Sequence, residues 1–584
     1  MTTRRMRFAS ASTSGIQHIP QALDHTINEQ STRNLDSILP YLSTNDVLPE
    51  SEVAKVKEKL RIWNQELTTN LNTHGSRSFM INQLPQNQID RPTQRDSLWA
   101  NIIAYSGCIS PVRQIPREIW EQIFILCIDE NETPSISARC SPLSLGAVSR
   151  LWREVAINTR YLWSKIHIPI SSSDIDRDQK LGDIVELWLS RSCGFPLSVS
   201  VVVNIGTPGF TDMTVTTILA ALIKFSEFWE SIHLEIPFDY FSSTLLATLQ
   251  AKDLPILQSV FISPTRVTPS DRSSHQSNHV VRTLPAWPIF KAPGLQRLRF
   301  FDSIVTPNLR DKWSQITDLR VESCYLTGDN CYEILSGCKN LQTCFLDNCD
   351  LYSMTSVVNT TMWQFRSVRL KYLTSFVLYE RTFLSIHFDV PSLRSFEYQG
   401  FFIRNRPSLI PHLLRSAQDL ESLRVDPGGV DLNELLVLTP SIKNLVFAKP
   451  SLTYPALHTM FTRGTNQGVT NDVIRRLTPN EVAAPMPNGY LCPALQSLVC
   501  KEDALRTFTT DVLLTCIQRR KQQSLIAGGN AAELKEVLIY SKLTLSSPPK
   551  YPVPPAKGDT FIGAELLKLV KGGMKIHLPD YNLD

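Results

Sequence analysis

One spacing of apolar residues recurs between residues 229 and 540 and constrains the fold more than any other feature. Three apolar positions follow the order apolar-x-x-apolar-x-apolar, usually after a proline, a cysteine or a polar residue. It occurs eleven times, as Trp229/Ile232/Leu234, Leu257/Val260/Ile262, Leu295/Leu298/Phe300, Ile316/Leu319/Val321, Leu341/Cys344/Leu346, Phe365/Val368/Leu370, Leu393/Phe396/Tyr398, Leu420/Leu423/Val425, Ile442/Leu445/Phe447, Leu495/Leu498/Cys500 and Leu534/Val537/Ile539. The middle residues are separated by 28, 38, 21, 25, 24, 28, 27, 22, 53 and 39 residues. Most of these separations fall between about 20 and 29 residues, which indicates a repeated structural unit.

Each copy of the pattern predicts a short strand followed by a helix. The last two apolar positions alternate, as they do in a strand with one face against a core. The intervening segments 409–414, 432–436 and 513–517 suit helices. A single strand–turn–helix unit cannot bury its own apolar edge, so neighbouring units must stack. This spacing resembles leucine-rich repeats, which implies an irregular right-handed α/β horseshoe. An ordinary α/β domain with short strands is the alternative.

The repeats set the predicted organisation of the chain. We expect a solenoid over 180–545 with an insertion at 450–493, and a C-terminal tail at 546–584. The insertion would contain a helix at 473–477 and would either contact a partner or be an idle loop. The polar residues 1–33 are expected to be disordered. Residues 34–95 are expected to form a helical segment and a linker, because apolar residues recur at helical spacing within 51–71.

A second feature is a pair of predicted amphipathic helices in residues 108–168. Pro116 suits the start of a helix in which Ile119, Ile123 and Leu126 form one stripe and Trp120, Phe124 and Cys127 lie beside it. A second helix is expected over 145–156, and residues 161–163 mark a short third turn. We expect this small unit to need a partner surface for its tryptophans.

This segment resembles an F-box of the type abundant in mushroom-forming fungi. The matching residues are Pro111, Val112, Ile115, Pro116, Glu118, Ile119, Gly146, Val148, Trp152, Arg153, Val155, Ala156, Leu162, Trp163 and Ser164. Ser149 stands where the family often has cysteine, and the loop between the helices is longer than in the compact animal form. The resemblance covers about 55 residues, and the helix just upstream is also similar to the fungal arrangement.

The resemblance implies a substrate receptor of an SCF-type cullin–RING ubiquitin ligase. The F-box would bind a Skp-family adaptor, and through it a cullin, by placing an apolar helix face in a groove. The adaptor-binding residues are expected to be Ile115, Pro116, Ile119, Ile123, Val148 and Trp152. The repeats would present an unknown target protein. A repeat scaffold without a ubiquitin link, in which the F-box-like helices cap the solenoid, is the alternative.

Net charge and hydropathy limit the other classes of partner that we expect for this protein. The net charge of +4 and the pI of about 8.4 do not favour nucleic acid as a partner. No apolar run approaches the length that crosses a bilayer, so we expect no membrane partner and a cytoplasmic or nuclear protein. Arg519, Arg520 and Lys521 are expected to form a solvated helix end, with a nuclear-import signal as the alternative.

The sequence offers no recognisable catalytic or metal-binding motif. Serine-hydrolase, zinc-protease and phosphate-loop motifs are not found, and the eleven histidines are isolated. His167 and His233 are expected to be satisfied histidines on strands. Five of the twelve cysteines cluster, but the spacing of Cys324, Cys331, Cys338, Cys344 and Cys349 favours buried free thiols over zinc. We therefore expect neither an enzyme nor a cofactor.

Overall fold

The chain divides into two compact units, Met1–Trp163 and Ser164–Asp584. The computed structural model describes residues 37–42, 44, 46–74, 94–128, 133–171, 175–204, 212–241, 244–265, 282–283, 288–301, 304–305, 313–324, 326, 328–348, 366–380, 386–400, 410–427, 430–448, 468–479, 490–501, 507–526, 531–540 and 557–578. The predicted disordered segment 1–33 and most of the predicted linker therefore lie outside the described residues.

The first unit is helical. Its elements are α2 (Leu39–Leu42), α3 (Glu50–His74), α4 (Gln94–Cys108), η5 (Pro111–Gln114), α5 (Arg117–Leu126), α6 (Leu143–Gly146), α7 (Arg150–Asn158) and η6 (Arg160–Trp163). Helix α3 confirms the helix predicted over 51–71, and its residues Val56, Leu60 and Leu67 are buried against α4. The ring of Trp63 on α3 meets that of Tyr105 on α4 edge-on, with the ring centroids 5.1 Å apart.

The second unit is built on a long parallel sheet, which confirms the predicted α/β class. Within the described residues, fourteen strands pair in chain order. They are β1 (Lys165–Ser171), β2 (Leu197–Asn204), β3 (Trp229–Pro237), β4 (Ser259–Thr265), β6 (Arg297–Phe301), β8 (Asp318–Cys324), β9 (Thr343–Asn348), β11 (Ser375–Glu380), β13 (Ser395–Gly400), β14 (Ser422–Val425), β15 (Asn444–Phe447), β16 (Ser497–Cys500), β17 (Glu536–Ile539) and β18 (Lys575–His577). Two further short pairs join β5 (Arg282–Thr283) to β7 (Ile304–Val305) and β10 (Arg366–Arg369) to β12 (Ile386–Asp389).

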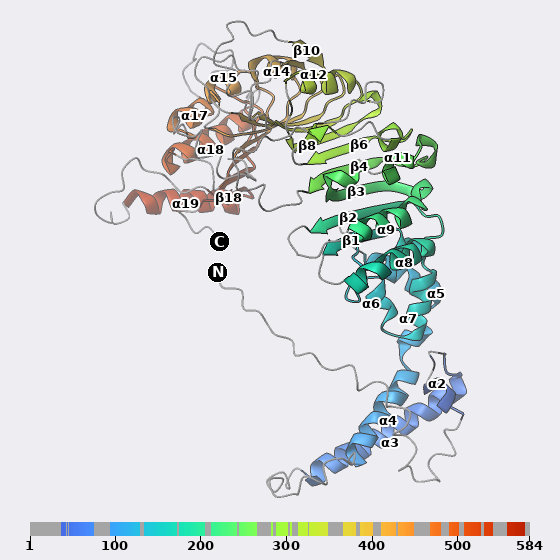
Figure 1. Cartoon of the computed structure of the whole chain (residues 1–584). Helices are drawn as coiled ribbons and strands as arrows, with labels where there is room; N and C mark the ends of the chain where they lie inside the picture. Colours follow the sequence, from blue (N-terminus) through green and yellow to red (C-terminus); the bar gives the residue numbers. More distant parts are fainter. Residues whose placement is uncertain are drawn as a thin grey trace, which may run out of the picture. The chain divides into compact units, whose positions relative to one another are not determined.

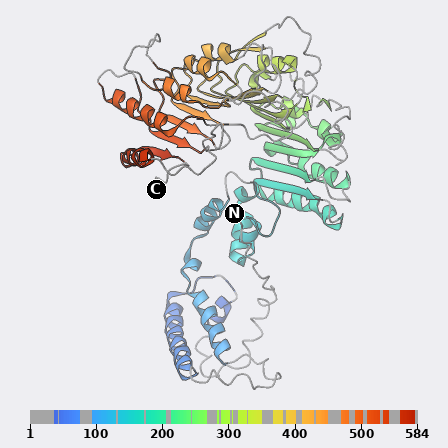
Figure 2. The same cartoon turned by 90° about the vertical axis from the view of Figure 1, so that its left-hand side faces the viewer.

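Helices follow one another along one side of this sheet (Figures 1 and 2). They are α8 (Ile175–Arg191), α9 (Asp212–Ile223), η7 (Ser226–Phe228), α10 (Phe238–Phe241), α11 (Thr244–Thr248), η8 (Ala251–Asp253), η10 (Pro288–Lys291), η11 (Trp313–Gln315), α12 (Gly328–Gly337), α14 (Ile410–Ser416), α15 (Leu432–Val437), α17 (Asn471–Arg476), α18 (Thr510–Leu525) and α19 (Lys557–Lys571). Parallel neighbours require a crossover of the chain, and in the described residues these helices lie between consecutive strands. The apolar rows of the strands are buried.

The register of the sheet places ten of the eleven predicted middle residues in one row. The row runs through Ile232, Val260, Leu298, Leu319, Cys344, Phe396, Leu423, Leu445, Leu498 and Val537. All ten side chains are at most 3 % exposed. From β6 to β17 in the long sheet, the backbone N–H of the residue before each strand donates to the carbonyl of the residue before the preceding strand, for example Thr374 N to Gln342 O at 2.8 Å.

The assignment of Val368 to that row is wrong. Val368 lies on β10, which pairs with β12 outside the long sheet, and the row instead continues through Phe376 on β11. Residues 373–378 also fit the apolar pattern. Two adjacent matches compete here, and only backbone pairing with β9 and β13 decides between them.

The predicted boundaries of the repeats also differ from the structure. The sheet begins at β1, inside the range assigned to the three-helix unit, and includes β18 in the segment expected to be a tail. In the predicted insertion 450–493, the helix predicted at 473–477 is present as α17, which buries Val473 and Ile474 and packs on α18. Residues 449–467 and 480–489 lie outside the described residues.

The expectation of a solvated basic run at 519–521 is wrong for its central residue. Arg520 lies inside α18 and is fully buried. Its Nε donates to Leu477 O at 2.9 Å, and its Nη2 donates to Leu491 O and Cys492 O at 3.0 and 2.9 Å. Leu477 ends α17, so the cation also faces the negative end of that helix dipole.

Candidate functional site

Helix α5 begins one residue after the predicted proline. Pro116 is the N-cap residue, with φ −57° and ψ 151°, and its carbonyl accepts from Ile119 N and Trp120 N at 3.1 and 3.2 Å. Proline suits this position because its fixed φ matches the backbone there. Its missing backbone N–H is not needed for a hydrogen bond within the helix. The acidic side chain of Glu118 lies in the first turn, where the helix dipole favours it.

The second predicted helix is broken at Val148. The chain forms α6 and then α7, with the two helices separated by residues 147–149. The break arises because the Ser149 hydroxyl accepts from Trp152 N at 3.2 Å and so starts a new helix. Val148 lies in this connection and its side chain is 62 % exposed.

Three aromatic rings join α5 to α7. The ring of Trp152 lies 4.7 Å from that of Trp120 and 5.0 Å from that of Phe124, measured between centroids. Trp120 and Phe124 are buried, and Trp152 is half-buried. Trp163 is buried as well, and its Nε1 donates to Ala156 O at 2.8 Å. The expectation that this unit needs a partner to cover its tryptophans is therefore wrong for Trp120 and Trp163.

Burial of these rings leaves an aliphatic surface on the outer side of α5. Ile119, Ile123 and Leu126 are 51 %, 36 % and 84 % exposed, and they recur at helical spacing. We call these three side chains the α5 stripe. Leu126 was missing from the expected adaptor-binding residues, although the same periodicity that selected its two neighbours also selects it.

The structure separates the six expected adaptor-binding residues into two groups. Ile119 and Ile123 share the α5 stripe, and Pro116 and Val148 are also exposed. Ile115 is half-buried just before α5. Trp152 instead packs with Trp120 and Phe124.

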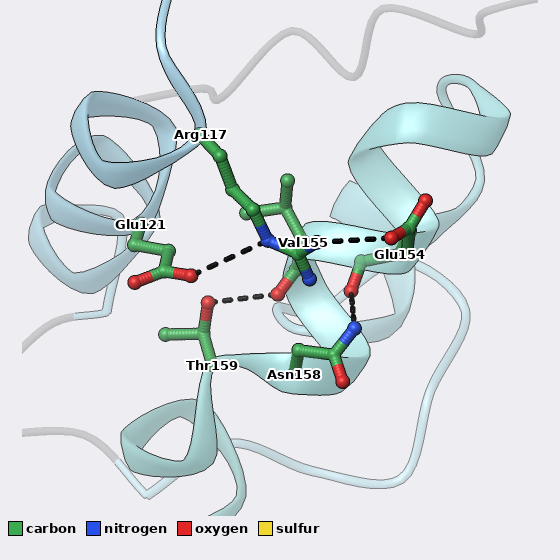
Figure 3. Close-up of polar contacts among 6 residues, drawn as sticks. All are labelled: Arg117, Glu121, Glu154, Val155, Asn158 and Thr159. Atoms are coloured by element: carbon green, nitrogen blue, oxygen red, sulfur yellow. Dashed lines mark hydrogen bonds and ion pairs between the residues drawn. The ribbon is translucent and has the colours of Figure 1, made fainter.

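A polar clamp of Arg117, Glu121, Glu154 and Asn158 links α5 to α7 (Figure 3). Arg117 Nη1 lies 2.9 Å from Glu154 Oε1 on α7, and its Nε lies 3.6 Å from Glu121 Oε1. Asn158 Nδ2 donates to Glu154 O at 2.8 Å. The exposed ion pairs contribute little stability by themselves, but they orient α5 and thus its aliphatic stripe.

A second surface lies on the face of the long sheet opposite the buried apolar rows, here called the open strand face. Side chains on ten successive strands are joined across it by nine contacts. They are His167, Ser200, His233, Phe261, Arg299, Arg320 with Glu322, Phe345, Tyr379, Glu397 and Arg424. Cross-strand pairs of this kind stabilise a sheet and restrict the side chains that it presents.

The contacts that link β1, β2 and β3 on this face are two hydrogen bonds that share the hydroxyl of Ser200. Ser200 Oγ lies 3.0 Å from His167 Nδ1 and 3.1 Å from His233 Nδ1. Both histidines are half-buried and bonded through Nδ1, but the buried Nε2 of His233 has no hydrogen-bond partner in the described part of the chain, so His233 is only partly satisfied. Burial, together with the charges of His167 and Arg299, lowers the pKa of His233 from 6.5 to about 4. At neutral pH His233 is therefore uncharged.

Acidification is expected to destabilise the second unit through His233. The folded-state pKa is depressed from 6.5 to about 4, so the stabilisation is complete above pH 6.5 and is lost as the pH falls toward 4. We expect roughly 2 kcal/mol to be lost across this window after allowance for solvent screening. Calorimetry of His233→Gln between pH 7 and 4 should show a shallower decline than the wild type. His577→Gln serves as the control, and an unchanged slope in His233→Gln would contradict the prediction.

The clustered cysteines form no evident reactive centre. Cys324, Cys331, Cys338 and Cys344 are buried free thiols, as predicted, and Cys349 lies outside the described residues. Burial raises the pKa of Cys338 to about 12. Among the described residues, no three histidine, cysteine or carboxylate side chains are arranged to hold a metal ion, and no helix is long and apolar enough to cross a membrane.

No protein-family model matches the chain, and no curated protein matches it significantly.

Proposed function

We propose that this protein is the substrate-receptor subunit of an SCF-type cullin–RING ubiquitin ligase. Residues 108–168 would act as the F-box and bind a Skp-family adaptor, and the parallel sheet, as an irregular leucine-rich-repeat solenoid, would bind the target. Ubiquitin transfer would take place on other subunits. The observation that carries the proposal is the exposed α5 stripe on a helix whose opposite side is fixed by buried aromatic rings.

The α5 stripe has the chemistry of a helix-in-groove contact. Ile119, Ile123 and Leu126 present aliphatic surface at a spacing that one face of a helix provides. The aromatic packing and the Arg117 clamp hold this face in place, which reduces the entropy lost on binding. Val148, exposed between α6 and α7, adds a further aliphatic side chain.

Adaptor binding is expected to depend on the stripe and not on the stability of the fold. Ile119→Ala/Ile123→Ala should weaken binding by about 2–4 kcal/mol, because truncation removes apolar anchors that a groove would desolvate. Binding is measured with the full chain and purified adaptor by calorimetric titration. Ile103→Ala, at an apolar side chain that is 63 % exposed on α4, should bind normally.

The outcome that contradicts the proposal is full adaptor affinity in the double variant. Trp152→Ala is a poor probe of the contact, because Trp152 packs on Trp120 and Phe124 and its loss would disturb the fold. Circular dichroism of the double variant separates lost contact from lost structure.

One observation favours the alternative of a repeat scaffold without a ubiquitin link. Trp120 and Trp163 are already buried in the free chain, so the unit does not require a partner to cover them. In that function the helices would only cap the solenoid. Co-expression discriminates between the two: a receptor forms a stable complex with the adaptor, whereas a scaffold purifies alone.

A further inference from the structure

Two arginines lie side by side in the middle of the open strand face. Arg299 on β6 and Arg320 on β8 are direct register partners. Their outer neighbours in the same row are Phe261 on β4 and Phe345 on β9. Like charges placed opposite each other across two strands destabilise a sheet. Glu322 on β8 supplies the counter-charge that this pair needs.

Each guanidinium is held in a fixed orientation. The Cζ of Arg299 lies 4.5 Å from the centroid of the Phe261 ring, and the Cζ of Arg320 lies 4.5 Å from the centroid of the Phe345 ring. Arg320 Nε donates to Oε1 of Glu322. Arg299 Nε lies 2.8 Å from the same oxygen as an ion pair, without hydrogen-bond geometry. Stacking and an Nε contact together fix the plane of a guanidinium.

The donors that remain point to an anionic partner. Within the described part of the chain, neither Arg299 nor Arg320 makes a hydrogen bond through its Nη nitrogens, and the two side chains are 42 % and 43 % exposed. One carboxylate, that of Glu322, serves both cations and is itself only 14 % exposed. Within the described residues, this carboxylate is the only ion-pair partner of either arginine.

We propose that this arginine pair binds a carboxylate side chain in an acidic segment of the target protein. The inference rests on the proposed role of the open strand face in target binding. The unbonded Nη groups of a planar guanidinium match the geometry of a carboxylate better than a flexible lysine does. Because both forks are already ordered by Phe261, Phe345 and Glu322, little side-chain entropy is lost when the carboxylate binds.

The test uses the full chain and a fluorescein-labelled peptide of alternating glutamate and alanine, followed by fluorescence anisotropy. We expect saturable binding that weakens with added salt and with glutamine in place of glutamate. Arg299→Gln/Arg320→Gln should weaken binding roughly tenfold or more. Arg415→Gln/Arg475→Gln, which removes the same charge from exposed positions on α14 and α17, should bind the peptide as the wild type does.

A third variant tests the role of the fork. Arg299→Lys/Arg320→Lys keeps the charge but loses the planar fork, so its affinity should fall between those of the wild type and the glutamine variant. Far-UV circular dichroism and melting of each variant verify that the sheet is intact.

Three results would overturn the proposal. They are no binding of the glutamate peptide to the wild type, equal losses in the two glutamine double variants, and binding only of a matching peptide with phosphoserine in place of glutamate. The last result would assign the pair to phosphate. Adaptor titration of Arg299→Gln/Arg320→Gln separates this inference from the proposed function, because the α5 stripe is unchanged in that variant.

Discussion

Replacement of Arg520 by leucine is expected to destabilise the second unit by on the order of 3 kcal/mol. The guanidinium is fully buried and donates to the carbonyls of Leu477, Leu491 and Cys492. Leucine fills part of the space but offers no donor, so these carbonyls lose a buried hydrogen-bond partner. Differential scanning calorimetry of the full chain should show a lower melting temperature for the transition of this unit.

The neighbouring arginine provides a matched control. Arg519 lies one residue earlier on α18 and is half-buried. Its one hydrogen bond within the described residues runs from Nη1 to Pro479 O at 3.5 Å. Arg519→Leu should therefore shift the melting temperature much less than Arg520→Leu. Equal decreases in melting temperature in the two variants would show that the loss of a positive charge from α18, and not the loss of the buried hydrogen bonds of Arg520, causes the destabilisation. Arg520→Lys should restore only part of the stability, because one ammonium group cannot reach both groups of carbonyls.

Trp120→Ala is expected to destabilise the first unit by about 3–5 kcal/mol. The side chain is 5 % exposed and packs with Phe124 and Trp152, so its removal leaves a cavity between α5 and α7. The variant should be cleaved in this unit by low concentrations of protease under conditions in which the wild type resists. Adaptor binding should also be lost, but through unfolding.

The adjacent residue separates packing from binding. Ile119 is 51 % exposed, so Ile119→Ala should change stability by less than about 0.5 kcal/mol. If Ile119→Ala instead matched the loss in Trp120→Ala, the assignment of inward and outward sides of α5 would be wrong. The two variants thus test which side of the helix supports the fold and which is free for a partner.

Much of the sheet could be predicted from the sequence because its apolar rows are local. A strand with one buried face imposes a period of two wherever it occurs, so Ile232 and Leu234 or Leu423 and Val425 indicate a strand without reference to the rest of the chain. The same holds for α3 and for the stripe of Ile119 and Ile123, which follow the helical period. Burial alone fixes these patterns.

Other strand assignments could not be made from the sequence, because they depended on which strands pair in the folded protein. Val368 and Phe376 fit the same pattern, and pairing with β9 and β13 selected Phe376. The strand that contains Ile576 could not be predicted either, because β18 is too short to show a periodicity. It is a strand because it pairs with β17.

The sequence by itself determined the α/β class, the repeated strands and the helical pair with its two apolar stripes, because apolar periodicity is written within a few consecutive residues. Only the tertiary structure decided that Trp120 and not Ile119 faces inward. It also decided that Arg520 is buried and that Arg299 lies beside Arg320. These outcomes depend on contacts between residues more than 20 positions apart. A pattern within a few consecutive residues does not specify which distant residues meet, so it cannot predict the free energy that such contacts contribute.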